Sequence, residues 1–308
     1  FSESSLFQVA EGNIKKESSS IKSLIQEAIT QIEEAAQKDD GLSGVPSGFS
    51  DLDRVTSGWQ RSDLVIVAAR PSMGKTAFVL SMTRNMAVDH NEGVAIFSLE
   101  MSSVQLVNRL ISSETQLGSE KIRSGKLEPY EWEQLEHRIK ALVDAPIYID
   151  DTPGMSSFEM RAKCRRLKSQ HDIKVVVIDY LQLMTGPPET RGNREQEVSM
   201  ISRALKGIAK ELNVPVIALS QLNRSVEMRS GDKRPQLSDL RESGAIEQDA
   251  DMVLFIHRPE KYGLMEFADG TPATGMGELI LAKHRNGALA DVKVRFRGEL
   301  AKFEDLED

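Results

Sequence analysis

The segment Leu64-Val-Ile-Val-Ala-Ala-Arg-Pro-Ser-Met-Gly-Lys-Thr-Ala77 decides the fold of this chain. Its first residues, Leu64 to Ala68, form an apolar run that predicts a buried strand, and the pattern from Ala77 to Val88 indicates a helix. A loop between a strand and a helix points several backbone N–H groups at one place, where the positive end of the helix dipole also lies. The segment therefore predicts a loop that binds the phosphates of a nucleoside triphosphate.

The side chains of this loop have separate expected roles. Lys75 is expected to reach the terminal phosphates, and Thr76 to hold Mg²⁺. The usual pattern begins with Gly, whereas this chain has Ala69, which restricts the backbone but keeps the phosphate-facing amide. The alternative is that Gly74 only makes a turn and Lys75 is a surface charge. We expect the nucleotide to be bound by the whole loop, which is Ala69, Arg70, Pro71, Ser72, Met73, Gly74, Lys75, Thr76 and Ala77.

The composition indicates one large α/β domain with an appendage. The chain has 308 residues, of which 40% are hydrophobic and 28% are charged, so it is long enough to bury a large core. The chain has no long apolar run that would predict a membrane span, and it has no cluster of Cys and His that would predict a zinc site. The net charge of −8 argues against a protein that coats nucleic acid, although a local basic surface is compatible with it.

The single cysteine, Cys164, excludes a disulfide framework and favours a reducing compartment, for which we expect the cytoplasm. Met160, Cys164 and Leu167 recur at helical spacing, so Cys164 is expected to be a small core residue. The chain begins at Phe1 and shows no signal-peptide pattern, which suggests that it was cut from something longer.

Four parts are expected along the chain. Residues 1–17 are polar and predicted to be flexible, and residues 18–40 form an amphipathic linker helix with a stripe of apolar residues. The composition of Gly41 to Gly48 indicates a linker, so this helix packs either on its own domain or on a neighbouring chain, and periodicity does not decide between them. Residues 41–303 form the main domain, and residues 304–308 are expected to be a solvated acidic tail.

Strands and helices alternate from Ser50 onward, which predicts a mostly parallel sheet with helices on both faces. The expected strands are Leu64–Ala68, Val94–Leu99, Ile147–Ile149, Val175–Ile178, Val214–Leu219 and Met252–Ile256. The expected helices lie near Lys75–Val88, Ser103–Glu114, Pro129–Val143, Ser157–Ser169 and Glu195–Leu212. A C-terminal β-hairpin is predicted from Gly277–Ala282 and Asp291–Arg297, which flank the turn Arg285-Asn286-Gly287.

Polar side chains follow four of the predicted strands. Asp179 is placed to support Mg²⁺, because ligands of open α/β sheets bind at the carboxyl ends of the strands. Glu100 is the candidate base that orients water, and its alternative role is to cap the helix that begins near Ser103. Asp150 and Asp151 are weaker rivals for the base. Gln221 is expected either to sense the terminal phosphate or to cap a loop.

Cationic residues cluster in three later segments. The loop Leu222–Gln236 contains Arg224, Arg229, Lys233 and Arg234, and Arg241 and Gly244 follow it. Such groups can hold a phosphate chain, but no aromatic residue lies among them for stacking, so local composition favours an ordinary solvated surface. Lys283, His284 and Arg285 are expected at the hairpin tip, where an Arg can reach a neighbour's phosphate.

Taken together, these residues resemble the C-terminal motor domain of the DnaB family of bacterial replicative DNA helicases, within the RecA-like ATPases. The matching stretches occur in the order of that family and cover nearly everything from Gly44 to Phe303. They are Ala69–Ala77, Phe97-Ser-Leu-Glu-Met101, Val176-Val-Ile-Asp-Tyr-Leu-Gln-Leu183, Leu219-Ser-Gln-Leu-Asn-Arg224, Asp239–Asp251 and Ala282-Lys-His-Arg-Asn-Gly287.

The resemblance implies a RecA-like fold and a homo-hexameric ring that hydrolyses ATP with Mg²⁺ and moves 5′ to 3′ on single-stranded DNA. It gives Glu100 the role of base, Gln221 that of phosphate sensor, and Lys283 and Arg285 a role in trans on the adjacent subunit's nucleotide. It also implies that residues 18–40 dock on a neighbour, and that the full-length protein meets primase and a helicase loader. Its DNA-binding residues map to Arg224, Arg229, Lys233, Arg241, Glu242 and Gly244.

Two other classes of protein fit the phosphate loop, Asp179 and Glu100, because a fold does not decide a function. One is a RecA-like recombinase or regulatory ATPase that binds single strands without unwinding duplex. The other is a small-molecule kinase, which needs an acceptor pocket.

Overall fold

The computed structural model describes residues 20–36, 41–187, 190, 192–229, 231 and 233–306. It divides into two compact units, residues 1–43 and residues 44–308. The expected flexible segment 1–17 lies outside the described residues, as do the last two residues of the expected acidic tail. Among the described helices, none is both long and apolar enough to cross a lipid bilayer.

The first unit contains the predicted amphipathic helix, α2, from Ile21 to Ala36. Ser20 precedes it, and its hydroxyl accepts a hydrogen bond from the backbone N–H of Ser23, which satisfies an unpaired donor of the first turn. Large apolar side chains of α2 are exposed, with 46% to 73% of their surface accessible, and these are Ile21, Leu24, Ile25, Ile29 and Ile32.

The second unit is built on one sheet, whose nine described strands have the order β3-β2-β4-β5-β1-β6-β7-β8-β9. The first six strands in this order are parallel to one another, and the pairs β6–β7, β7–β8 and β8–β9 are antiparallel. The predicted mixed sheet with a C-terminal hairpin is therefore confirmed. The parallel strands are β1 (Leu64–Ala69), β2 (Val94–Ser98), β3 (Ile147–Asp150), β4 (Val175–Asp179), β5 (Val216–Gln221) and β6 (Met252–His257). The antiparallel strands are β7 (Met276–His284), β8 (Ala290–Arg297) and β9 (Lys302–Glu304).

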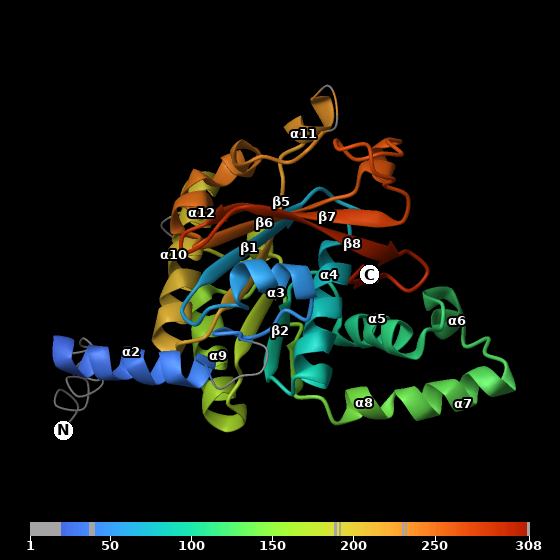
Figure 1. Cartoon of the computed structure of the whole chain (residues 1–308), viewed down its shortest axis with the longest axis horizontal. Coiled ribbons are helices and arrows are strands. Elements are labelled where there is room, and N and C mark those ends of the chain that lie inside the picture. The colour runs from blue at the N-terminus through green and yellow to red at the C-terminus, as the bar shows by residue number, and fades with distance from the viewer. Residues whose placement is uncertain are drawn as a thin grey trace. The chain divides into compact units, whose positions relative to one another are not determined.

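Helices cover both faces of the sheet and form two cores (Figure 1). Successive residues of β1 point to opposite faces, so Val65 and Val67 enter one core while Leu64 and Ile66 enter the other. The first core receives α3 (Ser50–Thr56), α4 (Lys75–Arg84) with the π-turn η1 (Asn85–Asp89), α5 (Ser103–Thr115) and α8 (Lys140–Val143). The second core receives α9 (Ser157–His171), α10 (Arg194–Leu212), α11 (Ser225–Met228) and α12 (Gly244–Asp249).

Cys164 lies in the second core and is fully buried, which confirms its predicted place. Burial raises the pKa of its thiol to about 12, so the thiolate is not formed near neutral pH. The remaining short elements are α6 (Ser119–Ser124), α7 (Pro129–Arg138) and the 3₁₀ turns η2 (Leu181–Leu183), η4 (Leu237–Ser243) and η5 (Pro259–Tyr262).

Two sequence expectations for the ends of this unit are wrong. Gly44 to Gly48 is not a free linker, because Val45 pairs with Trp59 and the backbone N–H groups of Ser47 and Gly48 donate to the carboxylate of Asp53. The expected solvated tail is also shorter than residues 304–308. Glu304 belongs to β9, and the carboxylate of Asp305 accepts hydrogen bonds from the backbone N–H and the hydroxyl of Ser50.

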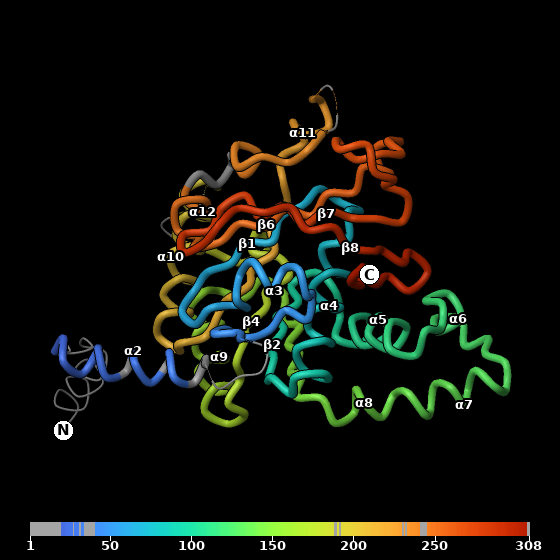
Figure 2. The backbone as a smooth tube through the Cα atoms, viewed as in Figure 1, coloured from blue at the N-terminus to red at the C-terminus, as the bar shows by residue number. Residues whose placement is uncertain are grey.

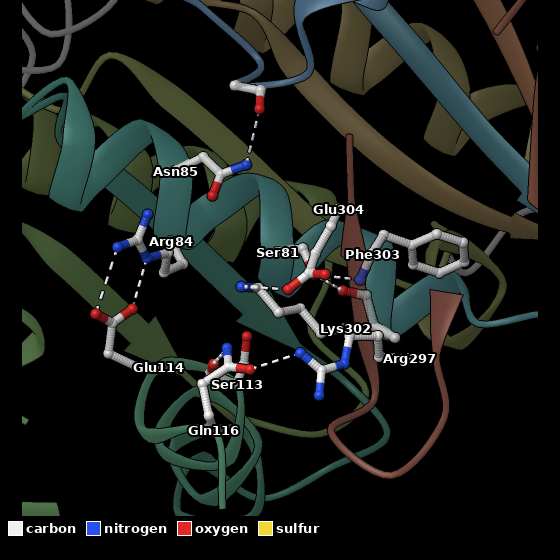
Figure 3. A network of polar contacts seen from close by, with 12 residues as sticks. Ser81, Arg84, Asn85, Ser113, Glu114, Gln116, Arg297, Lys302, Phe303 and Glu304 are labelled. Carbon is white, nitrogen blue, oxygen red and sulfur yellow. Dashed lines mark hydrogen bonds and ion pairs between the residues drawn. The ribbon is translucent and has the colours of Figure 1, made fainter. Parts of the chain in front are cut away.

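The last strand returns to lie beside α4, the helix that follows the phosphate loop (Figure 2). The backbone N–H of Phe303 donates to the hydroxyl of Ser81 on α4 at 2.9 Å (Figure 3). Nearby, the guanidinium of Arg297 donates to the side-chain oxygen of Gln116 at 2.8 Å, which ties the β8–β9 turn to the end of α5. The C-terminal strands are therefore held close to the phosphate loop.

Candidate nucleotide-binding site

Four adjacent strands of the sheet carry the predicted site residues at their carboxyl ends. In the order β2, β4, β5 and β1, these strands lead to Glu100, Asp179, Gln221 and the phosphate loop. The structure brings these groups together around a cavity of about 510 Å³. Its lining residues are Pro71, Ser72, Gly74, Lys75, Thr76, Ala77, Glu100, Arg109, Ser119, Asp179, Tyr180, Gln221, Phe296, Gly298 and Ala301.

The phosphate loop turns sharply where α4 begins. Gly74 has a φ of 100°, a conformation that favours glycine, and a Cβ at this position would lie 2.9 Å from the ring of Phe303. The ammonium of Lys75 donates to the carbonyl of Ala69 at 3.2 Å. Burial lowers the pKa of Lys75, while the nearby carboxylates of Asp179 and Glu100 oppose that shift. A polyphosphate in the cavity would stabilise this buried ammonium.

Thr76 and Asp179 form the oxygen-rich part of the cavity. The Thr76 hydroxyl donates to a carboxylate oxygen of Asp179 at 2.8 Å. Burial raises the pKa of Asp179, and the charge of Glu100 acts in the same direction, whereas the hydrogen bond from Thr76 opposes it. A divalent cation would relieve the unfavourable burial of this carboxylate.

These oxygens fit Mg²⁺, which takes oxygen ligands and commonly binds one or two protein groups together with substrate phosphates. In the part of the chain that the structure describes, no three His, Cys, Asp or Glu residues gather into a metal-binding group. A metal ion held here would therefore depend on phosphate oxygens of the nucleotide for its remaining ligands.

The local contacts favour Glu100 as the base over its rivals. Helix α5 is already capped by Ser102 and Gln105, so a capping role does not account for Glu100. Asp150 is bound by Lys163, and Asp151 accepts a hydrogen bond from the backbone N–H of Ser103 at 2.7 Å. Neither rival lines the cavity, whereas Glu100 is exposed in its wall.

Hydrogen bonds hold the backbone of Gln221 in place, and its side chain lines the cavity. The amide of Gln182 donates to the hydroxyl of Ser220 at 2.8 Å and to the backbone carbonyl of Gln221 at 3.3 Å. These bonds place Gln221 at the end of β5, next to Ala69 at the end of β1. The arrangement suits a side chain that contacts a terminal phosphate.

The structure adds cavity residues that the sequence did not indicate. Arg109 projects from α5, and its positive charge opposes the rise that burial causes in the pKa of Asp179. Phe296 comes from β8, and Gly298 and Ala301 come from the turn between β8 and β9, far from the phosphate loop in sequence. Tyr180 also lines the cavity. Of these added residues, only Tyr180 could have been found from the sequence, because it directly follows the carboxylate Asp179 at the end of a predicted strand.

Not every residue of the expected phosphate loop faces the cavity. Ala69 ends β1, and Met73 is buried in the first core. The expectation that Arg70 contacts the nucleotide does not match its placement. Its guanidinium instead donates to the backbone carbonyl of Leu222 and to the carboxylate of Glu227, because these acceptors satisfy its buried charge.

The expected DNA-binding residues are only partly free for a ligand. Arg224 is exposed and lines a second cavity of about 400 Å³, whose wall also contains Arg70, Arg194, Tyr180 and Gln221. Other cations of this region have partners within the chain: Arg229 pairs with Asp239, Arg234 with Glu278 and Asp291, and Lys233 lies over the ring of Tyr262. Arg241 and Glu242 lie in η4 and Gly244 begins α12, and the side chains of 241–244 lie outside the described residues.

Lys283 and Arg285 lie at the predicted hairpin, but both contact their own chain. The ammonium of Lys283 donates to the backbone carbonyls of Glu247 and Ala250 at 2.5 and 2.7 Å. The guanidinium of Arg285 donates to the carbonyl of Gln248 at 2.6 Å and to the Asp251 carboxylate at 3.2 Å. Both cations therefore stabilise the C-terminal end of α12, where a helix favours positive charge.

Curated relatives share most of this chain. It is 50% identical over 287 residues to the replicative DNA helicase DnaB of Geobacillus stearothermophilus, covering 93% of this chain and 62% of that protein. It is 47% identical over 305 residues to the replicative DNA helicase DnaC of Bacillus subtilis strain 168, covering 99% of this chain and 66% of the relative. The chain thus spans less than two thirds of the length of these two relatives.

Solved structures show the same arrangement. One of them, an ATPase domain, has a TM-score of 0.86 at 40% identity, covering 94% of this chain and all of that one. A DnaB-like replicative helicase, solved in a study of its interactions with primase, has a TM-score of 0.82 at 41% identity, covering 91% of this chain and 67% of that one. Residues 44–305 match the family described as the DnaB-like helicase C-terminal domain. The chain belongs to the DnaB-like helicase family and contains its C-terminal, RecA-like ATPase domain.

Proposed function

We propose that this chain is the ATP-driven motor of a replicative DNA helicase, which moves 5′ to 3′ on single-stranded DNA and unwinds duplex at the replication fork. One observation carries the proposal. The phosphate loop, Asp179, Glu100 and Gln221 meet around one cavity at the ends of four adjacent strands, which is an arrangement suited to phosphoanhydride hydrolysis.

The side chains of the cavity divide the chemistry among them. Lys75 binds the terminal phosphates, while Thr76 and Asp179 hold Mg²⁺, which neutralises phosphate charge when bound. Glu100 accepts hydrogen bonds from the attacking water and orients it in line with the leaving group. Gln221 touches the terminal phosphate and reports its loss to the segment that follows β5. The backbone of residues 71–77 cradles the phosphates, and the Ala69 carbonyl orients Lys75.

A homo-hexameric ring is the proposed assembly. The linker helix of residues 18–40 docks its apolar stripe on a neighbouring subunit, which gives a cyclic head-to-tail interface. Lys283 and Arg285 act in trans on the nucleotide of the adjacent subunit. Because both cations bind α12 of their own chain, this role requires them to exchange backbone carbonyls for a neighbour's phosphates.

The proposed DNA-binding surface faces the centre of the ring. It consists of Arg224, Arg229, Lys233, Arg241, Glu242 and Gly244. A positive field confined to the channel is compatible with a net charge of −8 on the whole chain. The proposed domains are the linker helix of residues 18–40 and the ATPase domain of residues 41–303, and the proposed compartment is the cytoplasm.

Primase and a helicase loader are proposed partners of the longer protein to which this chain corresponds. One solved relative is described together with its interactions with primase, which supports the primase contact. The chain spans only part of its relatives' length, so these contacts are to be tested with the full-length protein.

A forked-duplex experiment tests the proposed function. ATP turnover of the 308-residue chain is measured with and without oligo-dT, beside strand displacement and solution mass. A helicase motor shows DNA-stimulated turnover, a hexamer mass and displacement that depends on a 5′ single-stranded arm. DNA-stimulated turnover without displacement, even in the full-length protein, indicates a recombinase-like or regulatory ATPase. Turnover that responds to a small-molecule acceptor but not to DNA indicates a kinase.

A further inference from the structure

Arg70 belongs to the phosphate loop by sequence but is bonded to the segment after β5. Only 5% of Arg70 is exposed. Its guanidinium donates to the carbonyl of Leu222 at 2.6 Å and to a carboxylate oxygen of Glu227 at 2.9 Å, with a second nitrogen at 2.8 Å from the same oxygen. Removing a partner from a buried charge is unfavourable, so these bonds fix Leu222 and Glu227 relative to the loop.

The backbone strengthens this connection. The carbonyl of Ala69 accepts hydrogen bonds from the backbone N–H of Leu222 and from the ammonium of Lys75, each at 3.2 Å. One carbonyl therefore contacts both the segment after β5 and the side chain expected to bind phosphate. A displacement of Leu222 is transmitted to the position of Lys75 through this shared acceptor.

The other end of the connection lies in the proposed DNA-binding region. Glu227 is in α11, between Arg224 and Arg229, and its backbone N–H donates to the carbonyl of Arg224 at 3.0 Å. Arg70 and Arg224 line the same second cavity, which shares Gln221 with the nucleotide cavity. The Arg70–Glu227 ion pair thus joins the phosphate loop to the short helix that Arg224 and Arg229 flank.

We propose that the Arg70–Glu227 ion pair is a positioning link that sets how strongly single-stranded DNA stimulates ATP hydrolysis. This inference rests on the proposed function. A strand bound at Arg224, the exposed cation that precedes α11, fixes α11. Glu227 then holds Arg70, and with it the phosphate loop, in the position that orients Lys75. Neither member of the pair touches the reacting atoms.

Glu227→Gln tests the link, because it removes the charge but keeps the shape of a side chain that is 45% exposed. ATP turnover is measured without DNA and with saturating oligo-dT, beside oligo-dT affinity and the thermal midpoint. Because Gln keeps an oxygen that can accept from Arg70 and the carbonyl of Leu222 remains in place, basal turnover and affinity are expected to stay close to wild type and the midpoint to fall modestly. The stimulation is expected to fall by roughly two- to thirtyfold. Glu133→Gln, an exposed carboxylate of α7, is the matched control and should leave the stimulation unchanged.

A double-mutant cycle with Arg70→Lys separates the link from general support of the fold. If the pair acts as a unit, Arg70→Lys combined with Glu227→Gln lowers the stimulation no further than the more damaging single change. Wild-type stimulation in Glu227→Gln overturns the inference, as does an equal loss of turnover with and without DNA. Should Arg70→Lys not fold, the Glu227→Gln result decides alone. A wild-type chain whose turnover ignores DNA refutes the proposed function itself, a result distinct from an altered ratio in the variant.

Discussion

Thr76 and Asp179 are 103 positions apart in the sequence, yet the Thr76 hydroxyl donates to the Asp179 carboxylate at 2.8 Å. One residue lies in the first turn of α4, and the other ends β4. Burial raises the pKa of Asp179, so the folded protein holds an ionised carboxylate there unfavourably when the hydroxyl is its main partner. A buried carboxylate of this kind lowers the stability of the ligand-free fold and favours the binding of a cation.

Asp179→Asn should therefore separate stability from binding. Without nucleotide, the variant is expected to unfold at the same temperature as wild type or higher, because no buried carboxylate charge remains at this position. With Mg²⁺ and an ATP analogue at about 100 times the dissociation constant, wild type gains about 2.7 kcal/mol, and most of that gain should be lost in the variant. Thermal unfolding with and without ligand measures both effects.

Asp172→Asn is the control for this change, since Asp172 lies at the exposed end of α9, away from the cavity. It should keep the full gain from the nucleotide. An Asp179→Asn variant that gains as much from Mg²⁺ and nucleotide as wild type would contradict the proposed metal role.

Glu100→Gln is expected to bind ATP normally and to hydrolyse it slowly. The amide keeps the size of the side chain but removes the charge that polarises water, and loss of such a base lowers turnover by roughly 100-fold or more. Steady-state hydrolysis and direct nucleotide binding are measured together. Glu136→Gln, on the exposed side of α7, should behave as wild type. Turnover of Glu100→Gln near the wild-type value would contradict the assignment of Glu100 as the base.

Action in trans predicts rescue between two inactive proteins. Subunits with Lys75→Ala lack the phosphate contact, and subunits with Arg285→Ala lack the cation for their neighbour. Mixed rings contain some interfaces where an intact loop meets an intact hairpin, so the mixture should regain part of the hydrolysis that each protein lacks alone. Because Arg285 also binds α12 of its own chain, circular dichroism and solution mass must confirm folding and assembly. Assembled mixtures with no regained turnover would rule out trans action.

The sequence predicted the parts of the site that depend on local rules. An apolar run that ends in a polar residue predicts a strand end, and parallel strands have their carboxyl ends at one edge, so Asp179 and Gln221 were placed correctly beside the phosphate loop. The strand bounds were less accurate: β5 begins at Val216 rather than Val214 and extends to Gln221.

Contacts between segments far apart in the chain could not be predicted from the sequence. The phosphate-loop pattern assigned Arg70 to the nucleotide, but the direction of its side chain depends on Glu227, 157 positions away. Phe296 lines the cavity from β8, which pairs with β9, the strand that lies beside α4. The charge pattern of the sequence likewise predicted Arg229 and Lys233 to be free cations. In the folded chain Arg229 pairs with Asp239, and Lys233 lies over the ring of Tyr262.

A pH prediction concerns Asp63, a buried residue before β1. Burial, together with the nearby charge of Asp251, raises the pKa of Asp63 from its ordinary value of 3.8 to about 6, against the attraction of Lys206. Between these two values the folded protein binds more protons than the unfolded chain, so the free energy of unfolding falls as pH rises from about 4 to about 6. Above about pH 6 the Asp63 carboxyl is ionised in both the folded and the unfolded protein, so its destabilising effect no longer changes with pH.

Asp63→Asn should remove this dependence. Relative to wild type, the variant is expected to gain stability as pH rises from about 4 to about 6, with the largest difference above pH 6. Asp172→Asn should show the opposite sign, because hydrogen bonds from Lys168 and Lys174 lower the pKa of Asp172 to about 2, so its carboxylate stabilises the fold at neutral pH. Urea unfolding of the three proteins at about pH 4.5, 6 and 7.5 measures the Asp63 trend, whereas the difference between Asp172→Asn and wild type should be constant there, because the shifted pKa of Asp172 acts only between about 2 and 3.8. A difference between Asp63→Asn and wild type that stays constant with pH would contradict the raised pKa.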